Sequence, residues 1–307
     1  MGGTPRQWGE ELVPDQSGRT AVITGAGSGL GLETARALAF RGARVVFAVR
    51  DVDKAAAAVS RLRASSPAAT PVLVRLDLAD QASVREAAKE LNDRFPAIDL
   101  LINNAGVMWT ERSRTADGFE LQFATNHLGH FALTGLLLDA LRARPGARVV
   151  TIGSYLHKLG RMRFDDLNSE RGYGRYRAYN RSKLANLMFA LELQRRLAAS
   201  GADTLSLAAH PGLAATGLGR NIPGAVRTLT RPLAPLFLQP ARLGMLAGLR
   251  AATDPGARGG EFYGPLGLTE TKGPVGPARP GRSARDPRAW ERLWAESERM
   301  TGVAYDF

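Results

Sequence analysis

A tyrosine and a lysine stand four residues apart in the run Tyr179-Asn-Arg-Ser-Lys183. On a helix, residues with this spacing lie on one face, about 6 Å apart along the axis. A free phenol ionises at roughly pH 10, and a fixed ammonium group beside it lowers the pKa of that phenol. Tyr179 could therefore exchange a proton with an alcohol or a ketone as a general acid or base. The alternative is a pair on a solvent-exposed helix face, since this spacing also arises by chance.

Two neighbouring tyrosines compete with Tyr179 for this role. Tyr173 and Tyr176 lie in the same part of the sequence, but neither is followed by a lysine four residues later. The spacing therefore favours Tyr179 as the group that transfers the proton.

A glycine-rich turn separates the first predicted strand from the first predicted helix. It reads Gly25-Ala-Gly-Ser-Gly29-Leu-Gly31 and directly follows the apolar run Thr20–Thr24. Without side chains the backbone can approach a pyrophosphate, and the N–H groups of the helix start point at the anion. The order of strand, turn and helix favours a dinucleotide site over a glycine turn without a ligand. The contacts expected here are Gly25, Ser28, Gly29, Leu30 and Gly31, with Ser28 as a donor to the phosphate of the adenosine ribose.

The residue after the second predicted strand bears on which dinucleotide binds. Arg44–Val49 forms this strand, and Arg50 comes next. An NAD-selective site normally carries an acidic residue here for the ribose 2′-hydroxyl, whereas a cation suits a 2′-phosphate. The sequence therefore predicts NADP as the cofactor. Asp51 follows immediately and could serve the hydroxyl of NAD, which keeps NAD as the alternative.

The elements that would position these residues follow a βαβ rhythm. From Thr20 to about Ala209, short apolar runs alternate with longer helical segments. This order is typical of an α/β fold, here a single doubly wound Rossmann-type parallel sheet with helices on both faces. The predicted strands are Thr20–Thr24, Arg44–Val49, Val72–Leu76, Leu100–Asn103, Arg148–Gly153 and Thr204–Ala209. The predicted helices are Asp51–Ala64, Asp80–Phe95, Gly118–Arg142 and Tyr176–Ala199.

The pattern changes after Pro211, although we expect one domain over residues 1–307. Residues 212–252 are predicted to form a small substrate lid, because 222–238 carry scattered large apolar side chains. An apolar substrate would suit such a lid, although core packing explains these side chains equally well. Residues 254–287 are dominated by glycine and proline, and a short amphipathic helix is predicted at Arg288–Met300. Residues 254–307 are expected to wrap the core.

Three motifs occur in one order along the chain. These are Thr24-Gly25-x-x-x-Gly29-x-Gly31, then Asn103-Asn104-Ala105-Gly106 after the fourth predicted strand, then Tyr179-x-x-x-Lys183. Together they resemble the short-chain dehydrogenase/reductase family, over about residues 15–264. Within that family the chain is most similar to the retinol-dehydrogenase-like and protochlorophyllide-reductase-like branch, through Ala48-Val-Arg-Asp51, Asn126-His-Leu-Gly-His-Phe131 and Tyr179-Asn-Arg-Ser-Lys-Leu-Ala-Asn186.

The resemblance implies a catalytic set of Asn126, Ser154, Tyr179 and Lys183. Tyr179 would be the general acid/base, Lys183 would lower its pKa and hold a ribose, and Ser154 would donate to the substrate oxygen. Asn126 would support a proton-relay water through the helix backbone; a polar side chain satisfied by its own helix is the alternative. Ser169 competes with Ser154, because about two dozen residues separate Ser154 from Tyr179, roughly twice the spacing in many members. Ser154 is favoured since it ends a predicted strand, at the sheet edge where ligands bind.

The resemblance also implies further cofactor contacts. Asn104, Ala105 and Gly106 close the fourth strand. Asp77 and Leu78 would edge the adenine ring, and Asp77 could at the same time cap a helix. The remaining expected contacts are Pro211, Gly212 and Thr216 around the nicotinamide, together with Tyr179 and Lys183.

Composition narrows the class of protein. The 307 residues include no cysteine, which excludes disulfides, thiolate nucleophiles and thiolate metal ligands. The net charge of +12 comes from arginines spread along the chain, so a solvated basic surface is expected and a nucleic-acid partner is not. No segment has the length or hydrophobicity of a signal peptide or a membrane span, which predicts a soluble cytoplasmic protein.

Two polar pairs receive structural interpretations. His127 and His130 stand three apart on a predicted helix without a third ligand, so core or capping histidines are expected and no metal is predicted. Asp165 and Asp166 lie in a loop-like stretch and are expected to be solvated carboxylates.

These patterns predict an NADP-dependent oxidoreductase that transfers hydride between the nicotinamide and the carbonyl or alcohol group of an apolar small molecule. A catalytically silent NADP-sensing protein is the alternative, and a basic nucleic-acid-associated protein is a third interpretation. The family resemblance further suggests homodimers or homotetramers, formed through the helices Gly118–Arg142 and Tyr176–Ala199.

Overall fold

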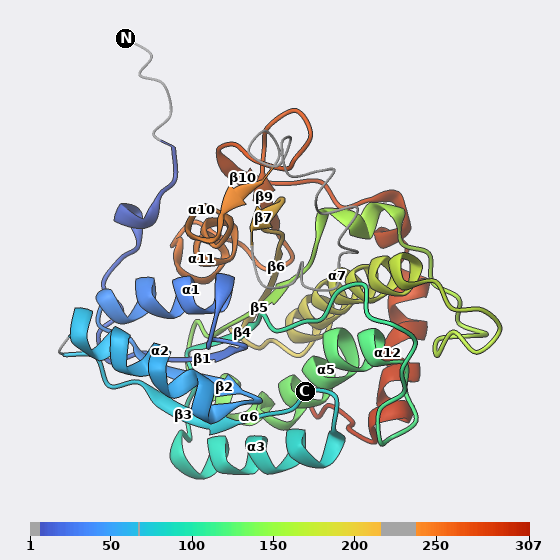
Figure 1. The fold of residues 1–307 in the computed structure, drawn as a ribbon, viewed down its shortest axis with the longest axis horizontal. Coiled ribbons are helices and arrows are strands. Elements are labelled where there is room, and N and C mark those ends of the chain that lie inside the picture. Colours follow the sequence, from blue (N-terminus) through green and yellow to red (C-terminus); the bar gives the residue numbers. More distant parts are fainter. Residues whose placement is uncertain (1–6, 67, 216–237) are drawn as a thin grey trace.

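The computed structural model describes residues 7–66, 68–215 and 238–307, and Figure 1 shows their arrangement. Its strands are β1 (Thr20–Thr24), β2 (Arg44–Val49), β3 (Val72–Arg75), β4 (Leu100–Asn103), β5 (Arg148–Ile152), β6 (Leu205–Ala209), β7 (Ala214–Ala215), β8 (Gln239–Pro240), β9 (Phe262–Pro265) and β10 (Val275–Pro277). Eight of them form one sheet in the order β10-β9-β6-β5-β4-β1-β2-β3, and β7 pairs with β8 separately. Within the large sheet, neighbours from β9 to β3 run parallel, whereas β10 is antiparallel to β9.

The central strands are apolar because helices cover both of their faces. All five residues of β1 are buried, as expected for a strand in a parallel sheet of this kind. The chain runs from β1 to β2 and β3 on one side of the sheet, and from β4 to β5 and β6 on the other. β1 and β4 therefore form the switch point, outside which ligands bind at the carboxyl ends of the strands. The six predicted strands are confirmed, each to within one residue at either end.

The helices are α1 (Gly29–Phe40), α2 (Val52–Ser65), α3 (Gln81–Arg94), α4 (Leu121–Phe123), α5 (Gly129–Leu136), α6 (Leu138–Arg142), α7 (Arg175–Ala199), α10 (Ala241–Gly244), α11 (Leu246–Thr253) and α12 (Pro287–Thr301), with 3-10 turns η1 (Glu10–Leu12), η3 (Tyr155–Leu159) and η5 (Arg282–Ala284). One apolar layer combines α1, α2 and α11 against the sheet. The opposite layer combines α3, α5, α6 and part of α7 (Figure 1). Within the described ranges, no helix combines the length and hydrophobicity needed to traverse a lipid bilayer.

The segment predicted as one helix, Gly118–Arg142, is broken. α4 leads into a π-helical turn, η2 (Ala124–Leu128), and Leu137 separates α5 from α6. At the end of η2 the N–H of Gly129 bonds to the carbonyl of Ala124, five residues back. Such a turn is wider than an α-helical one and is often found at functional sites. Asn126 lies within it.

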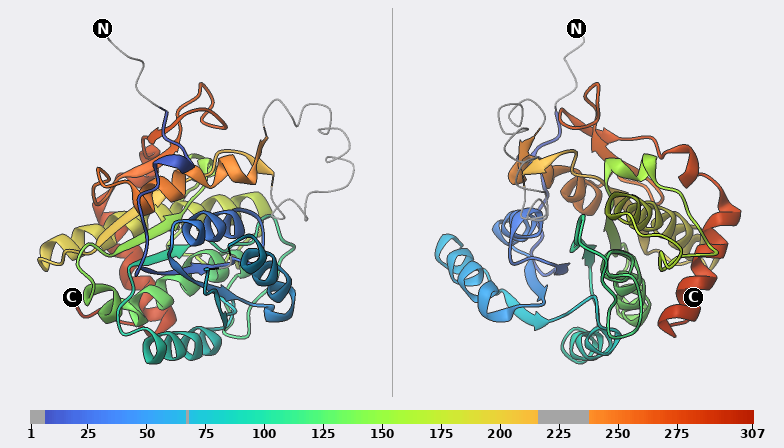
Figure 2. Two further views of the ribbon diagram at one scale, coloured as in Figure 1. Left: turned by 90° about the vertical axis from the view of Figure 1, so that its left-hand side faces the viewer. Right: turned by 45° about the vertical axis from the view of Figure 1, so that its right-hand side comes forward.

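The C-terminal residues 254–307 contribute more than the predicted wrap. β9 and β10, which the sequence pattern did not indicate, extend the sheet beyond β6, and α11 is part of the apolar layer with α1. Residues 244–252 of the predicted lid therefore pack largely in the core, while 216–237 lie outside the described residues. α12 packs along α7 and α5 (Figure 2), two helices in the segments through which subunit contacts were expected, and those contacts stay a prediction.

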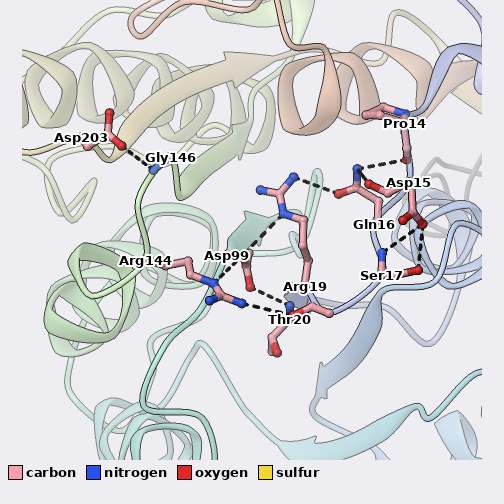
Figure 3. A network of polar contacts seen from close by, with 11 residues as sticks. Pro14, Asp15, Gln16, Ser17, Arg19, Thr20, Asp99, Arg144, Gly146 and Asp203 are labelled. Atoms are coloured by element: carbon pink, nitrogen blue, oxygen red, sulfur yellow. Dashed lines mark hydrogen bonds and ion pairs between the residues drawn. The ribbon is translucent and has the colours of Figure 1, made fainter.

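Asp99 links β1 to β4 by hydrogen bonds and ion pairs at the amino edge of the sheet. Its carboxylate accepts the backbone N–H of Thr20, the first residue of β1, at 2.8 Å. The same carboxylate pairs with Arg144 at 2.8 Å and with Arg19 at 3.5 Å (Figure 3). Because Asp99 directly precedes β4, this network fixes β1 beside β4 from the end opposite to the ligand edge.

Candidate active site

Tyr179 and Ser154 meet at the carboxyl edge of the sheet. Tyr179 lies near the start of α7, with 5% of its surface exposed. Ser154 stands two residues beyond the end of β5, and its side chain is near enough to the phenol of Tyr179 to lower the pKa of that phenol. Ser154 also caps η3, because its hydroxyl accepts the N–H of Leu156 at 3.2 Å. A substrate oxygen placed here would have two hydroxyl donors within reach.

Ser169, the competitor of Ser154, lies in a different environment. Its hydroxyl accepts a hydrogen bond from the guanidinium of Arg181, which also donates to the carbonyl of Asp166. The carboxylate of Asp166 accepts the N–H groups of Glu170 and Arg171, so this side chain shapes the loop and is buried instead of solvated. The fold therefore brings Ser154, and not Ser169, to Tyr179.

The two other candidate tyrosines are held elsewhere. The hydroxyl of Tyr173 donates to the carbonyl of Thr110 and accepts from the amide of Gln122, each at 2.8 Å. Tyr176 is half exposed, and its ring packs edge-on against Trp109. Tyr179 is the tyrosine that the fold places beside Ser154.

Burial dominates the electrostatics of the Tyr179 site. The ammonium of Lys183 lies 6.0 Å from the ring centroid of Tyr179 and donates to the carbonyl of Ile152 at 3.0 Å. Loss of hydration raises the pKa of Tyr179 to about 12, although the nearby side chain of Ser154 opposes this shift. The same loss lowers the pKa of Lys183 to about 8. Burial therefore outweighs any lowering of the Tyr179 pKa by Lys183, and the role of Lys183 as the partner of Tyr179 stays a prediction.

Asn126 clamps the loop after β4 to α7. Its side-chain oxygen accepts the N–H of Val107 at 2.8 Å, and its amide donates to the Val107 carbonyl and to the Ser182 hydroxyl, each at 2.9 Å. Ser182 in turn donates to the carbonyl of Tyr179 at 2.8 Å. The side chain of Asn126 is therefore satisfied by two other segments and not by its own helix. Gly106 lies close beside it, because a Cβ there would be only 3.0 Å from the Asn126 oxygen.

The glycine-rich turn closes against the end of β4. Gly25 has a φ of +68°, which favours glycine. A Cβ on Gly31 would lie 2.6 Å from the Asn104 amide nitrogen, so only glycine fits there. The N–H groups of Asn104 and Ala105 both donate to the hydroxyl of Thr24 at 2.9 Å. The predicted contacts of the turn and of β4 thus lie together at the switch point.

Ser28 and Arg50 flank this turn. Ser28 is the N-cap residue of α1, yet its side chain makes no capping hydrogen bond. The first-turn N–H groups of α1, which have no intrahelical partner, and this hydroxyl suit an anion. Arg50 follows β2 and is exposed. Asp51, the alternative for NAD, is the N-cap of α2, and its carboxylate accepts the N–H of Lys54 at 2.9 Å.

Asp77 and Leu78, which were expected to contact the adenine ring, make contacts within the loop after β3 and with the start of α5. Asp77 accepts the N–H of Ala79 at 3.0 Å, whereas the N-cap of α3 is Asp80. The cap role considered for Asp77 is therefore wrong. Leu78 is buried, and a Cβ on Gly129 would lie 2.4 Å from its carbonyl oxygen, so the loop after β3 packs closely on η2 and α5.

A pocket links the glycine turn to the loop after β6. Its lining includes Leu30, Asn104, Ile152, Pro211, Met245 and Gly248. Leu30, Asn104 and Pro211 were expected to contact the cofactor, and Gly212 follows Pro211 with a φ of +63°. Met245 and Gly248 come from the α10–α11 region, and no sequence signal marked them. Thr216, the last expected nicotinamide contact, lies outside the described residues.

His127 and His130 diverge instead of sharing a ligand. His127 bonds to Ser297 of α12 at 2.8 Å, whereas His130 bonds to the hydroxyl of Thr24 at 2.8 Å. Among the described residues, no three histidine, aspartate or glutamate side chains gather as a metal ion would require. Thr24 and His130 were not predicted as site residues, because their contact joins segments 106 positions apart in the sequence.

A parallel sheet with its switch point at β1 and β4, and a buried tyrosine beside a serine at the carboxyl edge, are typical of a dinucleotide-binding oxidoreductase of the Rossmann type. Residues 19–225 match the family described as short chain dehydrogenase, and the chain belongs to this family. It is accordingly an NAD(P)-dependent oxidoreductase that acts on CH–OH and C=O groups.

Similar proteins cover nearly the whole chain. Retinol dehydrogenase 12 of Homo sapiens is 40% identical, with 94% of this chain and 88% of that protein aligned. Polyprenol dehydrogenase of Mus musculus is 41% identical, with 95% and 86% aligned. These relatives confirm the resemblance to the retinol-dehydrogenase-like branch.

Solved structures share the fold. An uncharacterised protein from Mycobacterium paratuberculosis superposes with a TM-score of 0.83 at 40% identity, covering 98% of this chain and 100% of that chain. RhlG of Pseudomonas aeruginosa, solved as an NADP active-site complex, gives a TM-score of 0.63 at 25% identity and covers 81% of this chain and 94% of that chain.

Proposed function

We propose that this protein transfers hydride between NADP and the carbonyl or alcohol group of an apolar small molecule. The observation that carries the proposal is the buried phenol of Tyr179, which lies beside the buried Ser154 at the carboxyl edge of the sheet. Lys183 lies on the same face of α7, one turn further on.

The residues at the switch point fit a dinucleotide. The turn from Gly25 to Gly31 has no side-chain bulk where the backbone of β4 approaches. Ser28 and the first turn of α1 offer donors to a pyrophosphate or a ribose phosphate. The ammonium of Lys183 donates to the Ile152 carbonyl and, with three N–H groups, has further donors for a ribose hydroxyl.

Each catalytic side chain then has a defined task. The cofactor, when bound, supplies or accepts the hydride. In the direction of reduction, Tyr179 gives its proton to the substrate oxygen while Ser154 donates a hydrogen bond to the same oxygen. The pKa of about 12 keeps the phenol protonated at neutral pH, which is the form that reduction needs. The cationic form of Lys183 stabilises the phenolate that remains.

The choice of NADP rests on how two adjacent residues are engaged. The carboxylate of Asp51 is held by the N–H of Lys54, where it caps α2. Arg50 is exposed directly after β2, where it can meet a 2′-phosphate. The NADP complex of RhlG, a structural relative, supports this choice.

An apolar substrate is supported by the relatives. Two similar proteins are named retinol dehydrogenase and polyprenol dehydrogenase, after long apolar alcohols. The apolar residues predicted to form a lid lie almost entirely in 216–237, outside the described residues, and add no structural support.

The proposal is tested by the rate at which the protein oxidises NADPH or NADH in the presence of apolar aldehydes, ketones and quinones and of small charged carbonyl compounds. We expect turnover with NADPH and apolar substrates. Tight NADPH binding without turnover across this panel would instead indicate an NADP-sensing protein.

Replacement of Arg50 tests the cofactor choice. Arg50→Ala removes a charge-assisted contact, so we expect NADPH to bind about ten- to a hundred-fold more weakly, with NADH binding unchanged. The matched control is Asp51→Ala, which removes the cap of α2 and lowers stability but leaves the preference for NADPH. Fluorescence titration of both reduced cofactors measures this. Equal losses of NADPH and NADH affinity in Arg50→Ala would contradict the assignment.

A further inference from the structure

His130 joins the nucleotide-binding turn to the helix that carries Asn126. It is 1% exposed and lies in the first turn of α5. One ring nitrogen, Nδ1, is 3.0 Å from the backbone carbonyl of Asn126. The other, Nε2, is 2.8 Å from the hydroxyl of Thr24, the last residue of β1. The imidazole therefore spans from the end of β1 to the π-helical turn η2.

The partners of His130 fix the direction of every hydrogen bond. A carbonyl can only accept, so Nδ1 of His130 carries the proton and donates to Asn126. Burial lowers the pKa of His130 to about 4, so at neutral pH Nε2 has no proton and accepts from the Thr24 hydroxyl. That hydroxyl accepts the N–H groups of Asn104 and Ala105 and donates its proton to Nε2 of His130 at 2.8 Å. The carbonyl of Ile102, at 3.4 Å, is a second and more distant acceptor of the same proton.

The same chain of contacts continues to the catalytic tyrosine. The side chain of Asn126 holds Val107 on one side and Ser182 on the other. Ser182 donates to the backbone carbonyl of Tyr179. A displacement of Asn126 would therefore move both the loop after β4 and the start of α7.

We propose that His130 is a positioning residue that couples cofactor binding to catalysis: it orients Thr24 at the nucleotide turn and holds the main chain of Asn126 beside the Tyr179 site. The proposal rests on the oxidoreductase function described above. The Thr24 contact keeps Asn104 and Ala105 in place where the dinucleotide is expected. The hydrogen bond to the Asn126 carbonyl keeps Asn126 in position to bind Val107 and Ser182. Through Ser182 it also fixes the main chain at Tyr179.

His127 provides a matched control on the neighbouring turn. It is also 1% exposed, and burial lowers its pKa to about 3. Its Nε2 bonds to Ser297 of α12, and its ring contacts Phe123 and Phe189, away from Thr24. Replacement of either histidine removes a buried imidazole from the same helical segment, but only His130 touches the nucleotide turn.

The experiment separates the effects of the two hydrogen bonds of His130. His130→Phe keeps the ring volume and removes both hydrogen bonds. His130→Asn places an amide donor near the position of Nδ1, and His130→Gln places an amide oxygen near that of Nε2. NADPH affinity is measured by fluorescence titration, kcat by NADPH oxidation, and folding by urea titration, with His127→Phe as the control.

We expect His130→Phe to weaken NADPH binding and to lower kcat, each by about ten-fold, since buried partners lose their hydrogen bonds. His130→Gln should recover NADPH affinity while kcat stays low, and His130→Asn should recover kcat while affinity stays low. His127→Phe should lower only stability. Equal kinetics in His130→Phe and His127→Phe would overturn the proposal. Recovery of kcat by His130→Gln and of NADPH affinity by His130→Asn would overturn it as well.

A wild-type protein that binds NADPH without turnover would refute the proposed function instead, and the affinity measurements would still test the Thr24 contact.

Discussion

At the level of single residues, burial decides what Tyr179 and Lys183 can do. Desolvation disfavours the charged form of each side chain, so the pKa of the phenol rises to about 12 and that of the ammonium falls to about 8. A helical spacing of four residues predicts that the two groups are neighbours, but it says nothing of their hydration. The proximity was therefore predictable from the sequence, and the direction of the pKa shift of Tyr179 was not.

The lowered pKa of Lys183 predicts how activity depends on pH. The ammonium loses its proton as the pH rises through about 8, so the cation that stabilises the phenolate disappears above this value. We expect kcat/KM for carbonyl reduction to fall on the alkaline side with an apparent pKa near 8. Lys183→Arg keeps the charge, because a guanidinium stays protonated, and should remove this alkaline decrease even if the rate is lower overall. A decrease that persists unchanged in Lys183→Arg would assign it to another group.

At the level of elements, the irregular helix from α4 to α6 and the C-terminal helix α12 are the main departures from the sequence pattern. The run Gly118–Arg142 has a helical composition, but the break at η2 depends on contacts that Asn126 and His130 make with distant segments. β9 was missed for a similar reason. A short strand containing Gly264 and Pro265 forms through pairing with β6, which local composition does not reveal.

α12 supplies an aromatic cluster that closes the α5–α7 face. Trp294 is 2% exposed, contacts the rings of Phe131, Phe189 and Tyr305, and lies under the guanidinium of Arg196. The amphipathic helix at Arg288–Met300 was predicted from the sequence, whereas the surface that it covers was not.

Trp294→Ala should destabilise the protein by about 3–5 kcal/mol, because it leaves a large cavity between helices. The matched control on the same helix is Trp290→Ala, which removes a partly buried ring and should cost much less. Urea unfolding of both variants measures the free energies. Equal losses for Trp290→Ala and Trp294→Ala would contradict the view that Trp294 anchors α12.

At the level of the whole molecule, the sequence patterns located the six parallel strands and the residues at their carboxyl ends. Repeated βαβ units leave a strong local signal, since each buried strand is a continuous apolar run. The glycine turn, Asn104 and Tyr179 were predictable because motif spacing reflects close approach of the backbone. The positions of Met245, Gly248 and His130 at the site were not predictable, because their contacts form only when distant segments fold together.

We propose above that the buried phenol of Tyr179 transfers the proton in an NADP-dependent reaction. The most direct measurement compares NADPH oxidation by Tyr179→Phe with that by Tyr176→Phe, a half-exposed tyrosine one turn away. We expect Tyr179→Phe to lower kcat by at least about a hundred-fold while NADPH affinity stays nearly unchanged, and Tyr176→Phe to keep most of the activity. Wild-type turnover by Tyr179→Phe would contradict the account.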